Sequence, residues 1–182
     1  MQDTFWDFFT EIKYKSSYFD AYRCCARRID NSINFFTALL SATSIANWLI
    51  WGQHPKLWSV LIGVAQIIQI AKPYLPYSKH VAALKFAIPE IQTVLRQIEE
   101  VWNRGQHLEE IDDLEYSKHY NDYRKQYDAI VQKYVGDERI PVWKCLQKEA
   151  KEDTLRFFKY RYNTIEWSDL DAREEKTHTD AF

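Results

Sequence analysis

The chain has few of the residues that tight turns require. It contains only four glycines and five prolines among 182 residues. Glycine is the residue that most readily adopts the left-handed backbone of tight β-turns and phosphate-binding loops. The four glycines, at positions 52, 63, 105 and 136, are also too far apart for a dinucleotide fingerprint or a Walker loop. We therefore predict an all-α fold.

Cysteine is equally scarce. Cys24, Cys25 and Cys145 give no disulfide framework, and with the five histidines they give no zinc spacing. No Gly-x-Ser-x-Gly nucleophile elbow occurs. The first residues, MQDTFWDFFTEIKYK, lack the basic start and cleavage site of a secretory signal. These absences predict a protein of a reducing compartment that is not an enzyme and has no catalytic residues, metal or cofactor.

Charge is missing from one long segment. Residues 31–55 contain no Asp, Glu, Lys or Arg, whereas residues 81–182 hold 16 basic and 21 acidic residues. At a rise of ~1.5 Å per residue, a helix over residues 31–52 crosses a hydrocarbon core of about 30 Å. A shorter span is predicted over 57–77, where LWSVLIGVAQIIQIA is flanked by Lys56 and Lys72. The alternative is a pair of buried helices in a soluble bundle.

Basic residues set the orientation of this predicted two-helix transmembrane hairpin. Three arginines at 23–28 precede the first span and three lysines at 72–85 follow the second, while the connecting loop has only Lys56. The positive-inside rule therefore places both termini in the cytoplasm, at a bacterial inner membrane. The three tryptophans of WLIWGQHPKLW, residues 48–58, then form an aromatic belt at the outer surface.

Polar side chains recur along both spans at helical spacing. As candidate pore-lining residues the sequence offers Asn34, Thr37, Ser41, Ser44, Gln66 and Gln69. Two spans per chain cannot enclose a pore, so conduction requires a ring of protomers. The alternative is helix–helix packing, for which the Ser59-xxx-Gly63 pair permits close approach. Both interpretations predict a homo-oligomer in a lipid bilayer.

The charged remainder of the chain predicts helices in the cytosol. Residues 1–30 read as an amphipathic helix with an apolar face formed by Phe5, Phe8, Phe9, Ile12, Phe19 and Tyr22. Residues 78–167 read as a helical domain, with helices at 88–104, about 108–135 and 141–163. We expect residues 168–182, which are polar and acid-rich, to form a loose tail.

A stripe of tyrosines marks the helix near residues 108–135. Tyr116, Tyr120, Tyr123, Tyr127, Ile130 and Tyr134 alternate spacings of four and three, which is typical of a helix-packing seam. Basic residues lie between them, and aromatic rings beside cations can stack bases and neutralise phosphates. The candidate residues for binding a nucleotide or short oligonucleotide are Lys118, Tyr120, Tyr123, Arg124 and Lys125. A packing seam with ordinary i,i+4 charge pairs remains the alternative.

One spacing resembles a catalytic motif. Arg173 and His178, within REEKTH, satisfy the Arg-x4-His pattern of HEPN ribonucleases. In that family the pair sits on a packed helix, and two protomers meet there to cleave RNA. Here the pair falls in the predicted tail, without the rigid support that a catalytic pair needs. A membrane-tethered HEPN-like ribonuclease is therefore the alternative function.

The order of segments resembles the SLATT family of two-helix membrane effectors. The likeness is carried by FWDFFTEIKYKSSYFDAYRCCARRID, NFFTALLSATSIANWLIW, LWSVLIGVAQIIQIAKPYLPYSK and IPEIQTVLRQIEEVWNR. The resemblance implies a homo-oligomeric, ion-conducting pore of bacterial anti-phage defence, gated by a nucleotide or oligonucleotide from a companion nucleotidyltransferase. Membrane accessory proteins of RNA-targeting CRISPR systems share a similar plan and are a further alternative.

Overall fold

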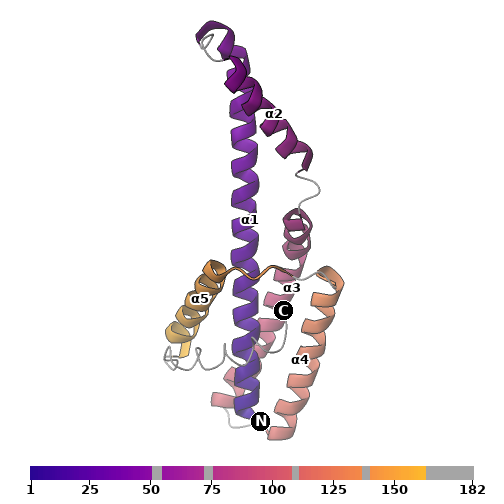
Figure 1. Ribbon diagram of the computed structural model, residues 1–182. Helices are drawn as coiled ribbons and strands as arrows, with labels where there is room; N and C mark the ends of the chain where they lie inside the picture. Colours follow the sequence, from indigo (N-terminus) through magenta and orange to yellow (C-terminus); the bar gives the residue numbers. More distant parts are fainter. Residues whose placement is uncertain (51–54, 72–75, 108–110, 137–139, 163–182) are drawn as a thin grey trace. The chain divides into compact units, whose positions relative to one another are not determined.

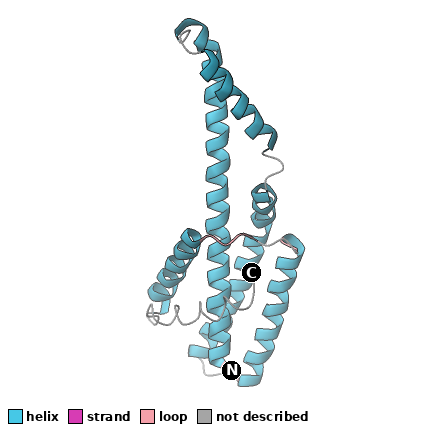
Figure 2. Ribbon diagram, in the orientation of Figure 1, coloured by secondary structure: helices cyan, strands magenta, loops and turns pink. Residues whose placement is uncertain are grey.

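The computed structural model describes residues 1–50, 55–71, 76–107, 111–136 and 140–162. These ranges contain five helices and no strand (Figures 1 and 2). The helices are α1 (Gln2–Ile50), α2 (Pro55–Ala71), α3 (Pro76–His107), α4 (Asp113–Tyr134) and α5 (Lys144–Tyr162). The predicted all-α fold is therefore confirmed.

Helix α1 is a single element of 49 residues. The sequence suggested an amphipathic helix over 1–30 followed by a separate apolar segment over 31–52. No glycine precedes Gly52 and no proline precedes Pro55, so nothing breaks the backbone hydrogen-bond ladder between the two segments. The boundary near residue 30 is thus a change in side-chain character along one continuous helix.

The chain divides into two compact units. Unit 1 comprises Met1–Tyr22 and Ala83–Phe182, and unit 2 comprises Arg23–Ala82. Helix α1 contributes to both units, as does α3, while α4 and α5 belong to unit 1 and α2 to unit 2. The predicted hairpin at 31–77 falls within unit 2.

The core of unit 1 is rich in aromatic side chains. All six residues of the predicted apolar face of α1 are buried, each with 6% or less of its surface exposed. Helices α3, α4 and α5 cover that face with further buried side chains: Ile91, Val94, Ile98, Tyr116, Tyr127, Ile130, Leu146, Leu155 and Phe158. The amphipathic face of α1 is therefore packed against protein, which is the position expected of its apolar stripe.

Helix α4 begins and ends at residues that satisfy its terminal backbone groups. The carboxylate of Asp112 accepts a hydrogen bond from the backbone N–H of Asp113 at 2.7 Å. At the other end, Gly136 adopts φ +61° and its N–H donates to the carbonyl of Val131 at 3.1 Å. Glycine takes this left-handed conformation without a side-chain clash, which explains why the helix stops here.

The two predicted spans coincide with helices. Residues 31–50 belong to α1 and residues 57–71 to α2. Positions 51–54 and 72–75 lie outside the described residues. Within the described part of the chain, no helix combines the length and the apolarity that crossing a membrane requires. Insertion of these helices into a bilayer therefore stays a prediction.

Candidate functional site

Unit 2 is organised around two neighbouring helices. The second half of α1 and the whole of α2 run back along each other as a helical hairpin (Figure 1). Side chains from both helices line a common groove of about 490 Å³. The hairpin is therefore a two-helix layer, and no third helix of the described chain belongs to this unit except the start of α3.

Large apolar side chains of the hairpin are exposed. They are Ile29, Phe35, Phe36, Leu39, Val60, Val64, Ile67, Ile68 and Ile70, with exposed fractions from 37% to 71%. Among the side chains of α2 that the structure describes, only Ala65 is buried. Exposed apolar surface is unfavourable in water, at roughly 25 cal/mol per Å², and so many large exposed apolar side chains on one pair of helices usually mark contact with lipid or with another chain.

Gln66 and Gln69 of α2 do not line the groove between the helices. Val64, Ala65 and Ile68 line the groove between the helices, whereas Gln66 and Gln69 are exposed and do not line it. A Cβ atom added at Gly63 would meet nothing within 4 Å, so this glycine faces open space. Within the described residues the predicted close approach at Gly63 has no partner in the same chain.

The predicted polar residues of α1 are divided between two directions. The hydroxyl of Thr37 donates to the carbonyl of Ile33 at 2.8 Å, and Thr37 lines the groove. The amide of Asn34 donates to the carboxylate of Asp30 at 3.3 Å and is exposed. The side chains of Ser41 and Ser44 lie outside the described residues. The structure therefore brings Thr37 between the helices and leaves Asn34 at the surface.

Both of the predicted ligand-binding tyrosines, Tyr120 and Tyr123, contact other side chains of unit 1. The ring of Tyr120 packs edge-on against Phe8, with centroids 5.0 Å apart, and its hydroxyl accepts a hydrogen bond from Arg124. This hydrogen bond raises the pKa of the Arg124 guanidinium. The ring of Tyr123 stacks on His119 at 5.7 Å with an interplanar angle of 12°. Tyr120 is thus part of the contact between α4 and α1.

The five predicted ligand-binding residues do not share one face of α4. Lys118 and Lys125 are seven residues apart, so they project on the same side, and both are exposed. Tyr120 and Arg124 are four residues apart and project on a different side. A nucleotide whose phosphate contacts both lysines therefore cannot stack its base on Tyr120 of the same helix.

The seam interpretation of α4 holds for its buried tyrosines. Tyr116 and Tyr127 are 3% and 7% exposed, and burial raises the pKa of Tyr127 far above its ordinary value. The hydroxyl of Tyr134 donates to Glu90 on α3, and this bond, with a second from Lys133, lowers the pKa of Glu90. Tyr116 and Tyr127 therefore act as packing groups, and Tyr134 acts as a hydrogen-bond donor.

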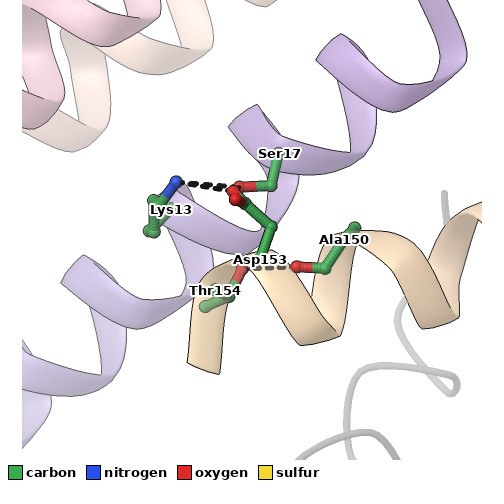
Figure 3. Close-up of polar contacts among 5 residues, drawn as sticks. All are labelled: Lys13, Ser17, Ala150, Asp153 and Thr154. Carbon is green, nitrogen blue, oxygen red and sulfur yellow. Dashed lines mark hydrogen bonds and ion pairs between the residues drawn. The ribbon is translucent and has the colours of Figure 1, made fainter. Parts of the chain in front are cut away.

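A polar cluster between α1 and α5 was not predicted from the sequence. Lys13 and Ser17, one turn apart on α1, both donate to the same carboxylate oxygen of Asp153 on α5, at 2.9 and 2.7 Å (Figure 3). The ammonium of Lys13 also lies 4.9 Å from the ring centre of Phe157. Next to Asp153, the buried hydroxyl of Thr154 donates to the carbonyl of Ala150. The cluster fixes α5 against the first helix.

This cluster makes the stability of unit 1 depend on pH. Burial pushes the pKa of Asp153 upward, but the hydrogen bonds from Lys13 and Ser17 outweigh it and hold the pKa below its ordinary value. A carboxyl whose pKa is lowered by folding stabilises the fold above its unfolded pKa and loses that contribution as the pH falls through the folded pKa. Because the Asp153 side chain is 53% exposed, the contribution is only about 1 kcal/mol.

Asp153→Asn is therefore expected to lower the free energy of unfolding by about 1 kcal/mol at pH 6. The gap to the wild type should begin to close below about pH 4 and vanish as the pH falls through the lowered folded pKa, where the wild-type carboxyl becomes protonated. Urea unfolding followed by circular dichroism at several pH values measures this gap. Glu152→Gln is the control, since among the described residues Glu152 pairs only with the exposed Lys148, at 4.0 Å. A gap that does not change with pH contradicts the assignment.

Other candidate chemistry is not found in the described residues. Arg173 and His178 lie outside them. Within the described ranges, no three His, Cys, Asp or Glu side chains gather in a group that could hold a metal ion. No family model, no curated protein and no solved structure matches this chain. The function must therefore be argued from the residues of the chain itself.

Proposed function

We propose that the protein is a membrane effector whose helical hairpin, residues 31–77, enters a lipid bilayer as a homo-oligomer and conducts ions. The observation that carries this proposal is the surface of the hairpin, where apolar side chains of both helices are exposed instead of buried. The resemblance in layout to SLATT effectors supports it. The amides of Asn34, Gln66 and Gln69 are exposed on the same hairpin. A helix with both kinds of exposed side chain is suited to contact lipid on one side and other copies of the chain on another side.

The length of α2 sets a condition on this proposal. Its 17 residues cover ~26 Å at ~1.5 Å per residue, less than a hydrocarbon core of about 30 Å. Short spans are accommodated by local thinning of the bilayer or by flanking residues that reach the interface, at a cost of fractions of a kcal/mol per Å. Lys56, in the first turn of α2, and Lys72, which follows α2 in the sequence, supply such residues.

The gating signal is the second part of the proposal. Following the resemblance, we assign it to a nucleotide or short oligonucleotide made by a companion enzyme. On α4, the pair that suits a phosphate is Lys118 with Lys125, because both are exposed, lie on one face, and have no ion-pair partner among the described residues. Tyr120, Tyr123 and Arg124 then act by holding α4 in place.

Ion release from liposomes tests the conducting function. Purified protein reconstituted in liposomes is expected to release a trapped ion, and Gln66→Leu is expected to slow this release by about tenfold, the effect of losing one interaction worth about 1.4 kcal/mol. Val60→Leu is the matched control, because Val60 is a 65% exposed apolar residue on the same helix. Liposomes that stay sealed at high protein loading contradict the proposal.

Assembly is tested separately at Gly63. Gly63→Leu adds a side chain where the chain itself has no atom within 4 Å, so the fold of one copy should tolerate it. A smaller particle in detergent, measured by light scattering, is the expected result if Gly63 lies between copies. Recovery of the wild-type protein as a detergent-free monomer in the supernatant after ultracentrifugation contradicts both membrane insertion and assembly.

A further inference from the structure

The groove between α1 and α2 has an apolar wall and a single cation. Seven of its ten lining residues are Cys25, Ile29, Ile33, Phe36, Val64, Ala65 and Ile68, and the others are Arg28, Ser32 and Thr37. Its volume of about 490 Å³ lies within the range of small-molecule sites, roughly 300–1,000 Å³. No Asp or Glu lines it, so the lining carries one positive charge.

The polar groups of the groove are arranged around Arg28. Arg28 is exposed and has no ion-pair or hydrogen-bond partner among the described residues. Ser32 follows four residues later, on the same face of α1 one turn further along, and is also exposed. Thr37, in contrast, already donates to the carbonyl of Ile33. Arg28 and Ser32 are therefore the two groups of the lining that remain available to an anionic ligand.

We propose that this groove binds an anionic phospholipid, with an acyl chain between α1 and α2 and the phosphate on Arg28 and Ser32. A guanidinium binds phosphate through two parallel hydrogen bonds, and a neighbouring hydroxyl supplies a third. The apolar lining takes the acyl chain, because aliphatic carbon has no polar group to desolvate there. The inference rests on the proposed membrane location of the hairpin. It names the class of lipid that the groove, near the predicted cytoplasmic end of the hairpin, selects.

Charge complementarity favours a phospholipid over a second protein helix in this groove. A helix of another copy would bring apolar side chains to Val64 and Ile68 but no phosphate to the exposed Arg28. A lipid phosphate neutralises the arginine and stays in the headgroup layer. The predicted orientation also places Arg28 at the cytoplasmic surface, where anionic lipids are concentrated.

Native mass spectrometry of the full chain in neutral detergent tests this site. With phosphatidylglycerol and phosphatidylcholine offered at equal concentration, the wild type is expected to retain the anionic lipid about tenfold better. Arg28→Glu should remove this preference, and Arg28→Lys should keep part of it. Arg27→Glu is the matched control, because the neighbouring Arg27 is exposed but does not line the groove.

Filling the groove gives a second, independent measurement. Ala65→Phe places a ring where Ala65 lines the groove with 9% of its surface exposed, and it should displace both lipids. Equal retention of the two lipids by the wild type, or equal loss in Arg27→Glu and Arg28→Glu, overturns the proposal. Palmitate retained as well as phosphatidylglycerol assigns the groove to free fatty acid and also overturns it.

The outcomes separate this inference from the pore. Sealed liposomes together with Arg28-dependent retention of phosphatidylglycerol end the conducting function and leave the lipid site standing. Liposomes that conduct, together with equal retention of the two lipids by the protein, end the lipid site and leave the conducting function standing. An Ala65→Phe chain that changes particle size without changing lipid retention places a second copy in the groove and overturns the lipid assignment.

Discussion

Phe158→Ala is expected to lower the free energy of unfolding of unit 1 by about 3–5 kcal/mol. Phe158 has no exposed surface and lies in the centre of an aromatic cluster contributed by α1 and α5. Its ring meets Trp6 at 5.0 Å and Phe9 at 5.1 Å, both edge-on, and lies 6.0 Å from Tyr162. Truncation removes these contacts and leaves a cavity that the surrounding rings cannot close without leaving their rotamers.

Chemical unfolding followed by tryptophan fluorescence measures this loss, because Trp6 touches the deleted ring. Tyr160→Ala is the control on the same helix, since Tyr160 is 93% exposed and should change stability by no more than about 0.5 kcal/mol. Release of α5 alone would leave the main unfolding midpoint in place and increase hydrogen exchange only in α5. Equal midpoints and equal exchange in the two variants contradict a central role for Phe158.

The periodicity of the sequence was sufficient to predict most of the helices and their buried faces. The six apolar positions predicted for α1 before residue 23 recur at helical spacing, and all six are buried. The tyrosines of α4 follow the same logic, because residues three and four apart share one face. The start of the last helix was predicted less well: the helix was expected over 141–163, but α5 spans Lys144–Tyr162. Val142 precedes α5 and is exposed, as is Cys145 in its first turn.

Long-range polar contacts were beyond the reach of periodicity. Lys13 and Asp153 are 140 residues apart, and nothing in either local sequence selects the other as its partner. Glu90 and Tyr134 meet in the same way across 44 residues. By contrast, the sequence alone could have shown that the five predicted ligand-binding residues lie on different faces of α4. The spacing of seven between Lys118 and Lys125 already places them together and apart from Tyr120.

The groove beside Arg28 illustrates the same limit in unit 2. A charge pattern predicted that Arg28 lies at the base of a hairpin, but the pattern could not show that Val64 and Ile68 of α2 return to it. Helix pairing depends on where the connecting turn brings the second helix back. Once the pairing is known, Arg28 and the apolar side chains that line the groove with it form a candidate ligand site. The sequence alone used Arg28 only to predict the orientation of the hairpin.

Gly105→Ala is expected to lower the free energy of unfolding by about 1–3 kcal/mol, although alanine favours helices over glycine. A Cβ atom at Gly105 on α3 would overlap the hydroxyl of Tyr116 and lie 2.7 Å from its Cζ atom. Tyr116 cannot easily move aside, because it is 3% exposed and its ring packs at 5.3 Å against Phe5. Gly105 is therefore needed for the close packing of α3 against α4, and not for an unusual backbone conformation.

Tyr116→Phe provides the second half of a double-mutant cycle. The Tyr116 hydroxyl is buried without a hydrogen-bond partner among the described residues, so its removal should be neutral or stabilise the fold by about 1 kcal/mol. In the double variant the overlapping oxygen is absent, and the cost of Gly105→Ala should fall by about 0.5–2 kcal/mol. Urea unfolding of the four proteins gives the coupling free energy. Strict additivity would show that the two positions do not touch, and a clear loss of stability in Tyr116→Phe would show that the hydroxyl is hydrogen-bonded in solution.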